Sequence, residues 1–409
     1  MRIPRFIDEK AFSPYARPMQ VFTILGSHPA LSNAEFEAVT GIAPSLSSAE
    51  VSIFDDVDEE ITKLQAKLGG IPKMGAIISS FTEYKHDELA ELLASLLIAG
   101  QSERKTTFGI SIYDLGNPAK ASQLQQKRQA LGLEVKKKIK NYGQNARYVT
   151  SRGTTLSAVD IRKNQILDRG AEFCLLVTKT EIFIGQTMTI QDYEDWGFRD
   201  FDRPSRDAKR GMLPPKLARM MVNLAGVDSY ERNLLDPFCG SGTVLMEAVM
   251  LGYDHVIGSD ILEDAVTDTR TNMEWLAAQG HAAEEIDLHH TRAANVHASV
   301  APDSIDVVVT EPFLGKPRQG DETEDAINVR IKELTKLYTE SFASIAKTMR
   351  KDAVAVVAFP VNFVKEKAFE IPVEEVAKAS GLKVSGRPLL YRQKGQYVGR
   401  MITRLTKAE

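Results

Sequence analysis

The chain has 409 residues, of which 43% are hydrophobic and 26% are charged, as is ordinary for a soluble globular protein. This length exceeds the usual size of one domain, so we expect two or three. No run approaches about 18 uninterrupted apolar residues and the start lacks a signal peptide's apolar core, which predicts neither a membrane-spanning nor a secreted protein. The two cysteines, Cys174 and Cys239, form no C-x-x-C pair, which argues against disulfides or structural zinc and favours a cytoplasmic protein.

Residues 1–85 are predicted to form a small α+β domain. Strands are expected at 21–25, 51–54 and 75–78, and a helix is expected at 61–68. A further helix is expected to begin directly after Ser32. The Ser32 side chain would cap this helix, with Glu35 as the capping-box partner.

Residues 86–190 are predicted to form a second domain with a basic surface. Its expected elements are helices at 87–97, 133–140 and 156–167, strands at 108–113 and 147–149, and a hairpin of 173–177 with 181–185. The net charge of the chain is only −4, but residues 127–169 contain eleven Lys or Arg against three Asp or Glu. This excess predicts a phosphate-binding surface, with an ordinary solvated helix face as the alternative. The candidate RNA-binding residues are Lys136, Lys137, Lys138, Lys140, Arg147, Arg152, Arg162 and Lys163.

Residues 191–210 alternate charged and aromatic side chains without a clear period, which predicts an ordered linker. The chain then becomes regularly α/β, with strands expected near Leu234 and Val256 and at 305–309 and 353–357. Their apolar runs are continuous rather than alternating, as in a buried parallel sheet. The end of the chain, 389–402, reads as a hairpin that turns at Lys394-Gly395 and adds an antiparallel strand.

The segment 236–243, Asp-Pro-Phe-Cys-Gly-Ser-Gly-Thr, joins a predicted strand to a predicted helix. Its two glycines allow a tight turn and a close approach to a ligand, and the helix that Thr243 opens directs free amides toward that ligand. Asp260 ends the next predicted strand, where a carboxylate can bind ribose hydroxyls. Leu245 replaces the third glycine of a dinucleotide fingerprint, which makes hydride chemistry less favoured. We assign no chemistry to Cys239.

This segment resembles motif I of the S-adenosylmethionine-dependent amino-methyltransferases, and Asp260 stands where that family places its ribose-binding acid. The resemblance implies S-adenosyl-L-methionine as the cofactor and a class I, Rossmann-like domain over 211–409. The antiparallel last strand expected above is also typical of that class. The implied cofactor-binding residues are Asp236, Pro237, Phe238, Gly240, Gly242, Thr243, Asp260 and Ile261.

The segment 310–315, Thr-Glu-Pro-Phe-Leu-Gly, follows the fourth predicted strand, where amino-methyltransferases carry Asp/Asn-Pro-Pro-Tyr/Phe. An exocyclic base amine is a poor nucleophile, so the site should accept its N–H bonds, orient its lone pair and stack the ring. The candidate catalytic residues are therefore Thr310, Glu311, Pro312 and Phe313. Either Thr310 or Glu311 could stand in the acid position, and Glu311 is slightly favoured. A purely structural turn, with Phe313 as a core aromatic, is the alternative.

The segment 211–225 resembles the Pro-Lys-Leu-Ala helix of the THUMP-containing tRNA guanosine-N2 methyltransferases, which modify position 10 of tRNA. The resemblance implies a ferredoxin-like domain at 1–85, a THUMP-like RNA-binding domain at 86–190, and tRNA as the partner. It implies no metal, and His289-His290 lacks a third ligand at a suitable spacing. The acid of the family's motif III is absent from 288–293, so no residue is assigned to the adenine.

Two other functions stay open at this point. A DNA adenine-N6 or cytosine-N4 methyltransferase would share the 236–243 motif, but the first half of the chain carries no helix-turn-helix signal. A non-catalytic RNA-binding protein would retain the fold with the altered 310–313 segment. The sequence also leaves open whether a small activating protein subunit takes part.

Overall fold

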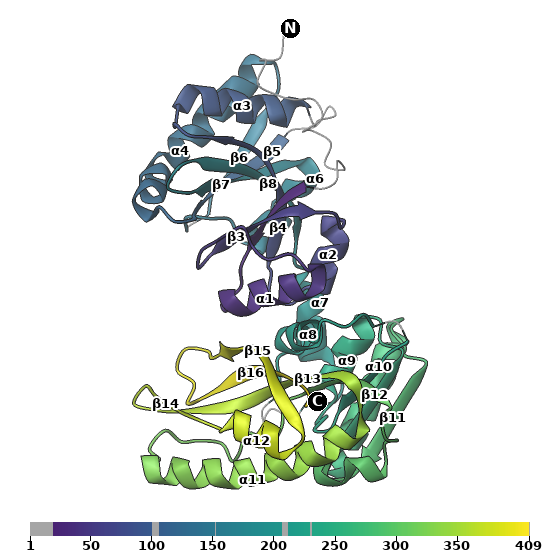
Figure 1. Cartoon of the computed structure of the whole chain (residues 1–409). Helices are drawn as coiled ribbons and strands as arrows, with labels where there is room; N and C mark the ends of the chain where they lie inside the picture. The colour runs from purple at the N-terminus through teal and green to yellow at the C-terminus, as the bar shows by residue number, and fades with distance from the viewer. Residues whose placement is uncertain (1–18, 100–105, 152, 207–211, 230, 409) are drawn as a thin grey trace. The chain divides into compact units, whose positions relative to one another are not determined.

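The computed structural model describes residues 19–99, 106–151, 153–206, 212–229 and 231–408. The chain divides into two compact units, one ending at Tyr193 and the other beginning at Glu194 (Figure 1). Each unit contains a sheet of its own. Within the described ranges, no helix combines the length and the apolar composition needed to cross a bilayer.

The first unit contains a sheet whose described strands run in the order β2-β3-β1-β4-β8-β7-β5-β6. β4 pairs with β8 along its length, so this sheet is continuous through residues that the sequence assigned to two domains; that division stays a prediction. The strands are β1 (Met19–Ile24), β2 (Leu46–Ser47), β3 (Val51–Val57), β4 (Lys73–Phe81), β5 (Thr106–Asp114), β6 (Ala146–Val149), β7 (Gly170–Val177) and β8 (Ile182–Ile190). The helices are α1 (Pro29–Thr40), α2 (Ile61–Lys67), α3 (His86–Ala99), α4 (Pro118–Asn141), α5 (Ala158–Lys163) and α6 (Ile166–Arg169).

The cap predicted for the first helix is wrong. Helix α1 begins at Pro29, whose fixed φ suits the first helical position, so Ser32 lies inside the helix. Ser32 instead donates from its hydroxyl to the carbonyl of Gly70 at 2.7 Å. The carboxylate of Glu35 is fully buried and accepts from the amides of Gly69 and Gly70 at 2.7 and 2.8 Å. Both side chains therefore hold the 69–70 turn against α1 rather than capping the helix.

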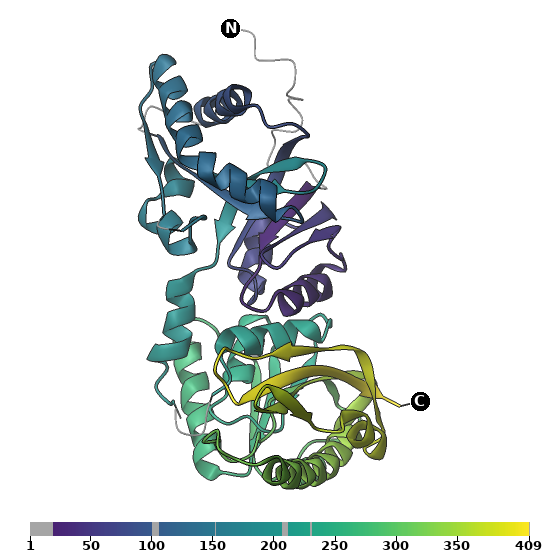
Figure 2. The same cartoon turned by 90° about the vertical axis from the view of Figure 1, so that its left-hand side faces the viewer.

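The basic helix is much longer than predicted, since α4 covers 24 residues. Asn117 caps its start by accepting a hydrogen bond from the amide of Lys120 at 3.1 Å. The single helix expected at 156–167 is two short helices, α5 and α6, separated by Gln165 with a φ of 51°. Helices α3 and α4 pack their apolar faces on β5, β7 and β8 (Figure 2). The strands and the hairpin predicted for this part of the chain are present.

A buried ion pair links β4 to β7. Lys73 donates from Nζ to the carboxylate of Glu172 at 2.8 Å, and both side chains are almost completely buried. The hydroxyls of Ser111 and Thr187 also donate to that carboxylate. Burial alone would lower the pKa of Lys73, but Glu172 raises it well above its usual range. Lys73 therefore stays charged inside the sheet.

The second unit contains a sheet with the strand order β11-β10-β9-β12-β13-β16-β15, to which β14 adds by pairing with β13. The strands from β11 to β13 are parallel, and β16 enters antiparallel between β13 and β15. This confirms the predicted parallel sheet and the antiparallel final hairpin. The strands are β9 (Asn233–Asp236), β10 (His255–Asp260), β11 (Glu285–His290), β12 (Ile305–Thr310), β13 (Met349–Val364), β14 (Lys367–Glu370), β15 (Leu382–Tyr391) and β16 (Val398–Lys407).

Helices cover both faces of this sheet (Figure 1). The face formed by Leu235, Val308 and Val357 packs on α11 (Glu324–Thr348), α12 (Val373–Ala379) and the short helix η3 (Ala293–Ala298). The opposite face contacts α8 (Pro215–Leu224) and α9 (Thr243–Met250), and α10 (Glu263–Ala278) packs beside α9. The predicted linker continues into this unit as α7 (Tyr193–Gly197) and a π-helical turn, η2 (Phe198–Asp202).

Candidate active site

The glycine turn lies between β9 and α9, at the carboxyl edge of the parallel strands where doubly wound sheets bind ligands. Gly240 and Gly242 have φ values of 54° and 82°, in the left-handed region that favours glycine. A Cβ at Gly242 would also come within 2.9 Å of the Thr269 methyl group. Cys239 is buried, and burial raises the pKa of its thiol well above its usual range.

Helix α10 fixes the turn through two polar side chains on its buried face. The hydroxyl of Thr269 donates to the carbonyl of Gly240, and the amide of Asn272 donates to the carbonyl of Ser241, each at 2.8 Å. Asn272 also exchanges hydrogen bonds with the backbone of Ser205, which follows the η2 turn. The sequence analysis missed both residues, although two polar positions three apart on an otherwise apolar helix stripe were a usable signal.

Asp260 ends β10 as predicted and is tied to the glycine turn. Its Oδ2 accepts from the amide of Gly240 at 3.1 Å, and its Oδ1 accepts from the amide of Leu262 at 3.0 Å. A carboxylate has about four lone-pair positions, so acceptor capacity is left for a ribose. Ile261 is 52% exposed beside it, and the ring of His290 on β11 lies 3.0 Å from the Ile261 carbonyl.

A buried hydrogen bond joins the cofactor segment to the acceptor segment. The hydroxyl of Thr310 donates to Oδ1 of Asp236 at 2.6 Å, and the amide of Phe238 donates to the same oxygen at 3.1 Å. Burial raises the pKa of Asp236 to about 7, although the two hydrogen bonds by themselves would lower it. Both side chains are at most 2% exposed, so Thr310 is committed to Asp236.

Glu311 forms an ion pair with Arg400 on β16, in which Nε of Arg400 donates to the carboxylate. The two side chains are 14% and 11% exposed, respectively. Phe313 is 54% exposed, and its carbonyl accepts from the hydroxyl of Tyr338 on α11 at 2.7 Å. Pro312 is buried between these two residues. The segment therefore presents an aromatic face beside a carboxylate whose charge is compensated.

The loop that follows is held by two arginines. Gly315 has a φ of 90°, and Arg330 on α11 donates to the carbonyl of Leu314 at 2.8 Å. Arg318 donates to the carbonyls of Phe363 and Tyr397 at 2.9 and 3.1 Å. The loop is thereby attached to the ends of β13 and β16.

Buried cations surround the first turn of α9. Arg203 is 2% exposed and donates to the hydroxyl of Thr243 at 2.7 Å, whereas its Nε has no hydrogen-bond partner among the described residues. Nearby, Glu247 on α9 binds both Arg199 and Arg219, at 2.8 and 2.7 Å. A helix N-terminus with a buried guanidinium beside it suits a carboxylate, which is the group that the methionine part of S-adenosylmethionine carries.

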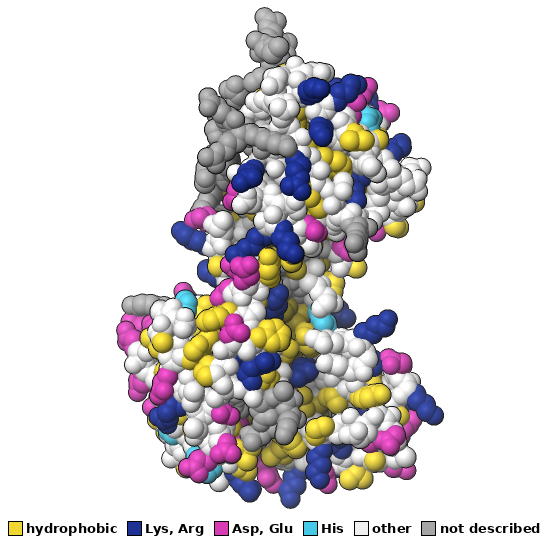
Figure 3. Space-filling model, turned by 180° about the vertical axis from the view of Figure 1, so that it is seen from behind, with side chains coloured by type: hydrophobic (Ala, Val, Ile, Leu, Met, Phe, Trp, Pro, Cys, Tyr) yellow, Lys and Arg dark blue, Asp and Glu magenta, His cyan; other side chains and the backbone are white. Residues whose placement is uncertain are grey.

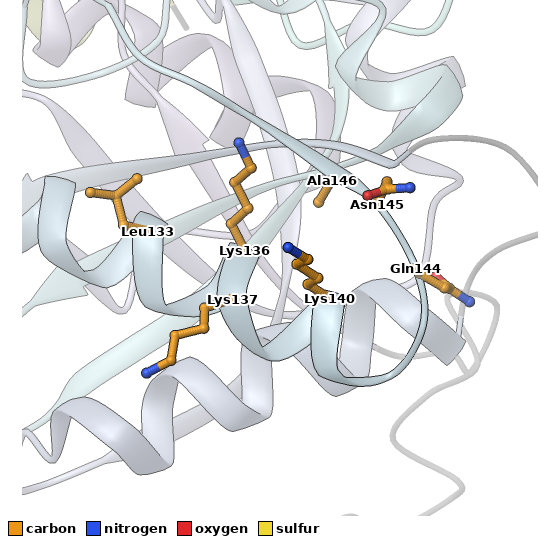
Figure 4. A pocket seen from close by; sticks show the side chains of 7 residues that line it. All are labelled: Leu133, Lys136, Lys137, Lys140, Gln144, Asn145 and Ala146. Atoms are coloured by element: carbon orange, nitrogen blue, oxygen red, sulfur yellow. The ribbon is translucent and has the colours of Figure 1, made fainter.

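The candidate RNA-binding residues lie in the first unit. Lys136, Lys137 and Lys140 line a pocket of about 220 Å³ together with Leu133, Gln144, Asn145 and Ala146. Lys136 and Lys140 point to the same side of α4, whereas Lys137 points away from it (Figure 4). On the face seen in Figure 3, basic side chains of this unit stand among uncharged ones, with fewer acidic ones.

Two of the other basic candidates are neutralised. Lys138 pairs with Glu91 at 3.0 Å, and Arg162 pairs with Asp192 at 2.7 Å. Arg147 on β6 and Lys163 on α5 are exposed. Arg152 lies outside the described residues. In the part of the chain that the structure describes, no group of three or more His, Cys, Asp or Glu could hold a metal ion.

The site coincides with a family match, because residues 203–387 match the model of the RMKL-like methyltransferase domain. This part of the chain is therefore similar to that domain. The S-adenosylmethionine dependence of such domains agrees with the glycine turn, Asp260 and the cation-flanked N-terminus of α9. The matched residues thus include both the predicted cofactor segment and the predicted acceptor segment.

Curated proteins that are similar to part of this chain are named tRNA (guanine(10)-N2)-dimethyltransferase. That of Methanothermobacter thermautotrophicus is 37% identical over 105 residues, which cover 26% of this chain and 28% of the relative. That of Pyrococcus abyssi is 30% identical over 189 residues, which cover 46% of this chain and 47% of the relative. The matches thus span less than half of the length of these relatives.

Solved structures share the fold of the whole chain. TrmN from Thermus thermophilus superposes with a TM-score of 0.56 and 16% identity, covering 95% of this chain and 99% of TrmN. A protein described as a possible methylase from Clostridium difficile 630 superposes with a TM-score of 0.51 and 14% identity, covering 96% and 98%. The likeness extends over both units, so the α/β class predicted from the sequence is confirmed.

Proposed function

We propose that the protein methylates the exocyclic N2 amine of a guanosine in tRNA, with S-adenosylmethionine as the methyl donor. The observation that carries the proposal is the structure of the acceptor segment. Glu311 is paired with Arg400, and Phe313 is exposed. Both follow Thr310, whose buried hydrogen bond to Asp236 links the segment to the glycine turn. The names of the relatives from Methanothermobacter and Pyrococcus support the choice of tRNA and of guanine N2.

The cofactor residues have separate roles in this proposal. S-adenosylmethionine supplies a methyl group on a sulfonium, which makes that methyl electrophilic. The Asp260 carboxylate accepts hydrogen bonds from the ribose hydroxyls. It uses the lone pairs that remain after the amides of Gly240 and Leu262 have donated to it. Arg203 and the N-terminus of α9 receive the carboxylate of the methionine part. The turn at Gly240 and Gly242 allows the backbone to approach the ligand.

The acceptor residues orient the amine. Glu311 accepts a hydrogen bond from an N–H of the amine and would take up that proton as the N–C bond forms and the methyl–sulfur bond breaks, which leaves S-adenosylhomocysteine. Arg400 balances the carboxylate charge before substrate binds. Phe313 stacks on the base. Thr310 is left out of this role because its hydroxyl is bonded to Asp236. The base has to be unpaired or flipped to reach the edge of the sheet.

The first unit supplies the RNA affinity in this proposal. Lys136 and Lys140 point to one side of α4, and neither forms an ion pair with an acidic side chain of the described residues, so they are proposed to contact phosphates together. Residues 86–190 are proposed to act as the THUMP-like RNA-binding domain, preceded by the ferredoxin-like domain at 1–85. Such contacts set affinity and salt dependence rather than the choice of base.

Labelled methyl transfer tests the function. The purified full chain is incubated with radiolabelled S-adenosylmethionine and either unmodified tRNA transcripts or DNA, and the methylated nucleoside is identified after digestion. We expect N2-methylguanosine from tRNA. Label in DNA would replace the proposal with a DNA methyltransferase, and cofactor binding without transfer to either nucleic acid would contradict it.

Two variants separate binding from turnover. Asp260→Ala is expected to abolish cofactor binding, because it removes both the ribose acceptor and the bond to the Gly240 amide. Phe313→Ala is expected to bind the cofactor as the wild type does and to lose turnover, because an exposed side chain contributes little to the fold. Retained methylation in both variants would overturn the site assignment.

A further inference from the structure

Asn362, near the end of β13, carries a carboxamide that the fold leaves without a partner. The residue has no exposed surface. Within the described ranges, neither its Oδ1 nor its Nδ2 makes a hydrogen bond. Buried polar groups are nearly always paired because an unpaired one loses its bonds to water without replacement. An amide that is unpaired at both atoms therefore calls for a ligand or a functional reason.

The strand register places this amide on the face of the sheet that carries the acceptor carboxylate. In the antiparallel pair of β13 and β16, Pro360 lies opposite Arg400, and Asn362 lies opposite Val398. Residues directly opposite share a face, as do residues two apart on one strand. Asn362 thus shares its face with Arg400, whose guanidinium binds Glu311. Asn362 lies two residues along β13 from the position opposite Arg400, a distance of about 7 Å along the strand.

We propose that Asn362 recognises the amide edge of the target guanine, formed by C6=O6 and N1–H. Its Nδ2 donates to O6 and its Oδ1 accepts from N1–H, while Glu311 accepts from the 2-amino group. This inference rests on the proposed function, because it assigns a residue to the base whose amine is methylated. It makes Asn362 a specificity-determining residue that contacts the substrate.

The arrangement of donors and acceptors selects guanine. Guanine presents an acceptor, a donor and an amine in that order along one edge, and these meet the Asn362 donor, the Asn362 acceptor and the Glu311 carboxylate. Adenine has no amine at C2, so the Glu311 carboxylate would have no donor to pair with. Asn362 could still pair with adenine, but only after its carboxamide rotated by half a turn. A buried polar group left unpaired by the wrong substrate discriminates strongly.

The loop after the acceptor segment is bonded to the strand ends beside Asn362. Arg318 donates to the carbonyls of Phe363, the residue after Asn362, and of Tyr397, the residue before Val398. These bonds hold the loop at the end of the strand pair that carries the amide. Because Asn362 is fully buried, the base binds only after the structure around the amide opens.

The test compares two substrates that differ only at the amide edge. One tRNA carries guanosine at the methylated position and the other carries 2-aminopurine, which keeps the 2-amine but lacks O6 and N1–H. We expect the wild type to favour guanosine in kcat/KM by about 100-fold or more. Asn362→Leu is expected to lose most of this preference through a lower kcat/KM for guanosine, with the value for 2-aminopurine unchanged.

Two controls keep a folding defect apart from a loss of recognition. Asn362→Leu should unfold at a temperature at least as high as the wild type, because leucine has similar size and no unpaired polar atom, and it should bind S-adenosylhomocysteine equally well. Ser341→Ala on α11 removes another buried hydroxyl that lacks a partner among the described residues, and it should leave both substrates unaffected.

Equal loss on both substrates, or no change on either, would overturn the role of Asn362 while the methyl-transfer function stood. A wild type that binds S-adenosylhomocysteine and methylates neither RNA would contradict the proposed function and this inference with it. A selective loss on guanosine in a variant that folds and binds normally is the result that supports both.

Discussion

Nε of Arg400 donates to the carboxylate of Glu311, which joins the antiparallel strand β16 to the segment after β12. The two residues are 89 positions apart in the chain and both side chains are largely buried. The pair therefore depends on the insertion of β16 beside β13. The guanidinium thereby gives a largely buried carboxylate a partner at the proposed acceptor site.

Replacing Arg400 should lower turnover and spare the cofactor site. Arg400→Met leaves the Glu311 carboxylate without its partner, so we expect kcat to fall by about 10- to 100-fold while the dissociation constant of S-adenosylhomocysteine stays unchanged. Arg400→Lys should restore part of kcat because it retains the positive charge. Arg392→Met is the matched control, since Arg392 lies in the same hairpin region and pairs with the exposed Glu366. An equal loss of kcat in both variants would indicate a general effect on the hairpin.

The free energy of unfolding should depend on pH through Asp236. Burial raises the pKa of Asp236 to about 7, from an ordinary value of 3.8 in the unfolded chain. Between these values the unfolded chain releases a proton that the folded protein retains, so stability falls as pH rises from about 4 to about 7. Asp236→Asn should remove this contribution. Its free energy of unfolding at pH 8 should exceed that of the wild type by at most about 4 kcal/mol, because each pKa unit corresponds to about 1.4 kcal/mol.

Denaturant unfolding at pH 5 and pH 8 measures this difference for the wild type and Asp236→Asn. The two proteins should differ less at pH 5 than at pH 8. Asp306→Asn is a control at another buried carboxylate of the same sheet, which is paired with Arg232 and Arg350 and should not reproduce the gain at pH 8. If the free energy of unfolding of the wild type rose between pH 5 and pH 8 by as much as that of Asp236→Asn, the raised pKa of Asp236 would be refuted.

A side chain at Gly242 should damage the cofactor site. In Gly242→Ala the new Cβ would come within 2.9 Å of Thr269, whose hydroxyl holds the Gly240 carbonyl, so the turn itself has to shift. We expect the affinity for S-adenosylhomocysteine to fall by at least about tenfold, measured by calorimetry. Gly280→Ala is the control, because Gly280 has a similar positive φ of 92° with no atom within 4 Å of the added Cβ. Unchanged affinity in Gly242→Ala would remove the turn from the proposed site.

Charge reversal on α4 should weaken tRNA binding in a salt-dependent way. In Lys136→Glu/Lys140→Glu the two side chains that point to one side of the helix lose their positive charge. We expect weaker binding and a logarithmic salt slope that is shallower by about one unit for each phosphate that the helix no longer binds. Lys63→Glu on α2 is the control, because Lys63 is exposed and paired with Glu60. Equal affinity of the double variant and the wild type would move the RNA surface elsewhere.

Local patterns predicted the sheet of the second unit well. The continuous apolar runs at 305–309 and 353–357 are buried parallel strands, and the turn at Lys394-Gly395 joins β15 to β16 as expected. The cap at Ser32 failed because Pro29 begins the helix earlier, and Glu35 is used by a turn more than thirty residues away. Capping patterns describe neighbours in sequence, and they cannot anticipate a distant segment that competes for the same side chain.

The sequence by itself determined the glycine turn, the position of Asp260 at the end of its strand, the proposed acceptor segment after the fourth strand and the α/β order, because each depends on residues close together in the chain. The tertiary structure alone decided which distant side chains complete the site. It placed Arg400 on Glu311, committed Thr310 to Asp236, fixed the turn through Thr269 and Asn272, and left Asn362 buried without a partner among the described residues. These relationships come from strand order and register, which bring together residues that no local spacing connects.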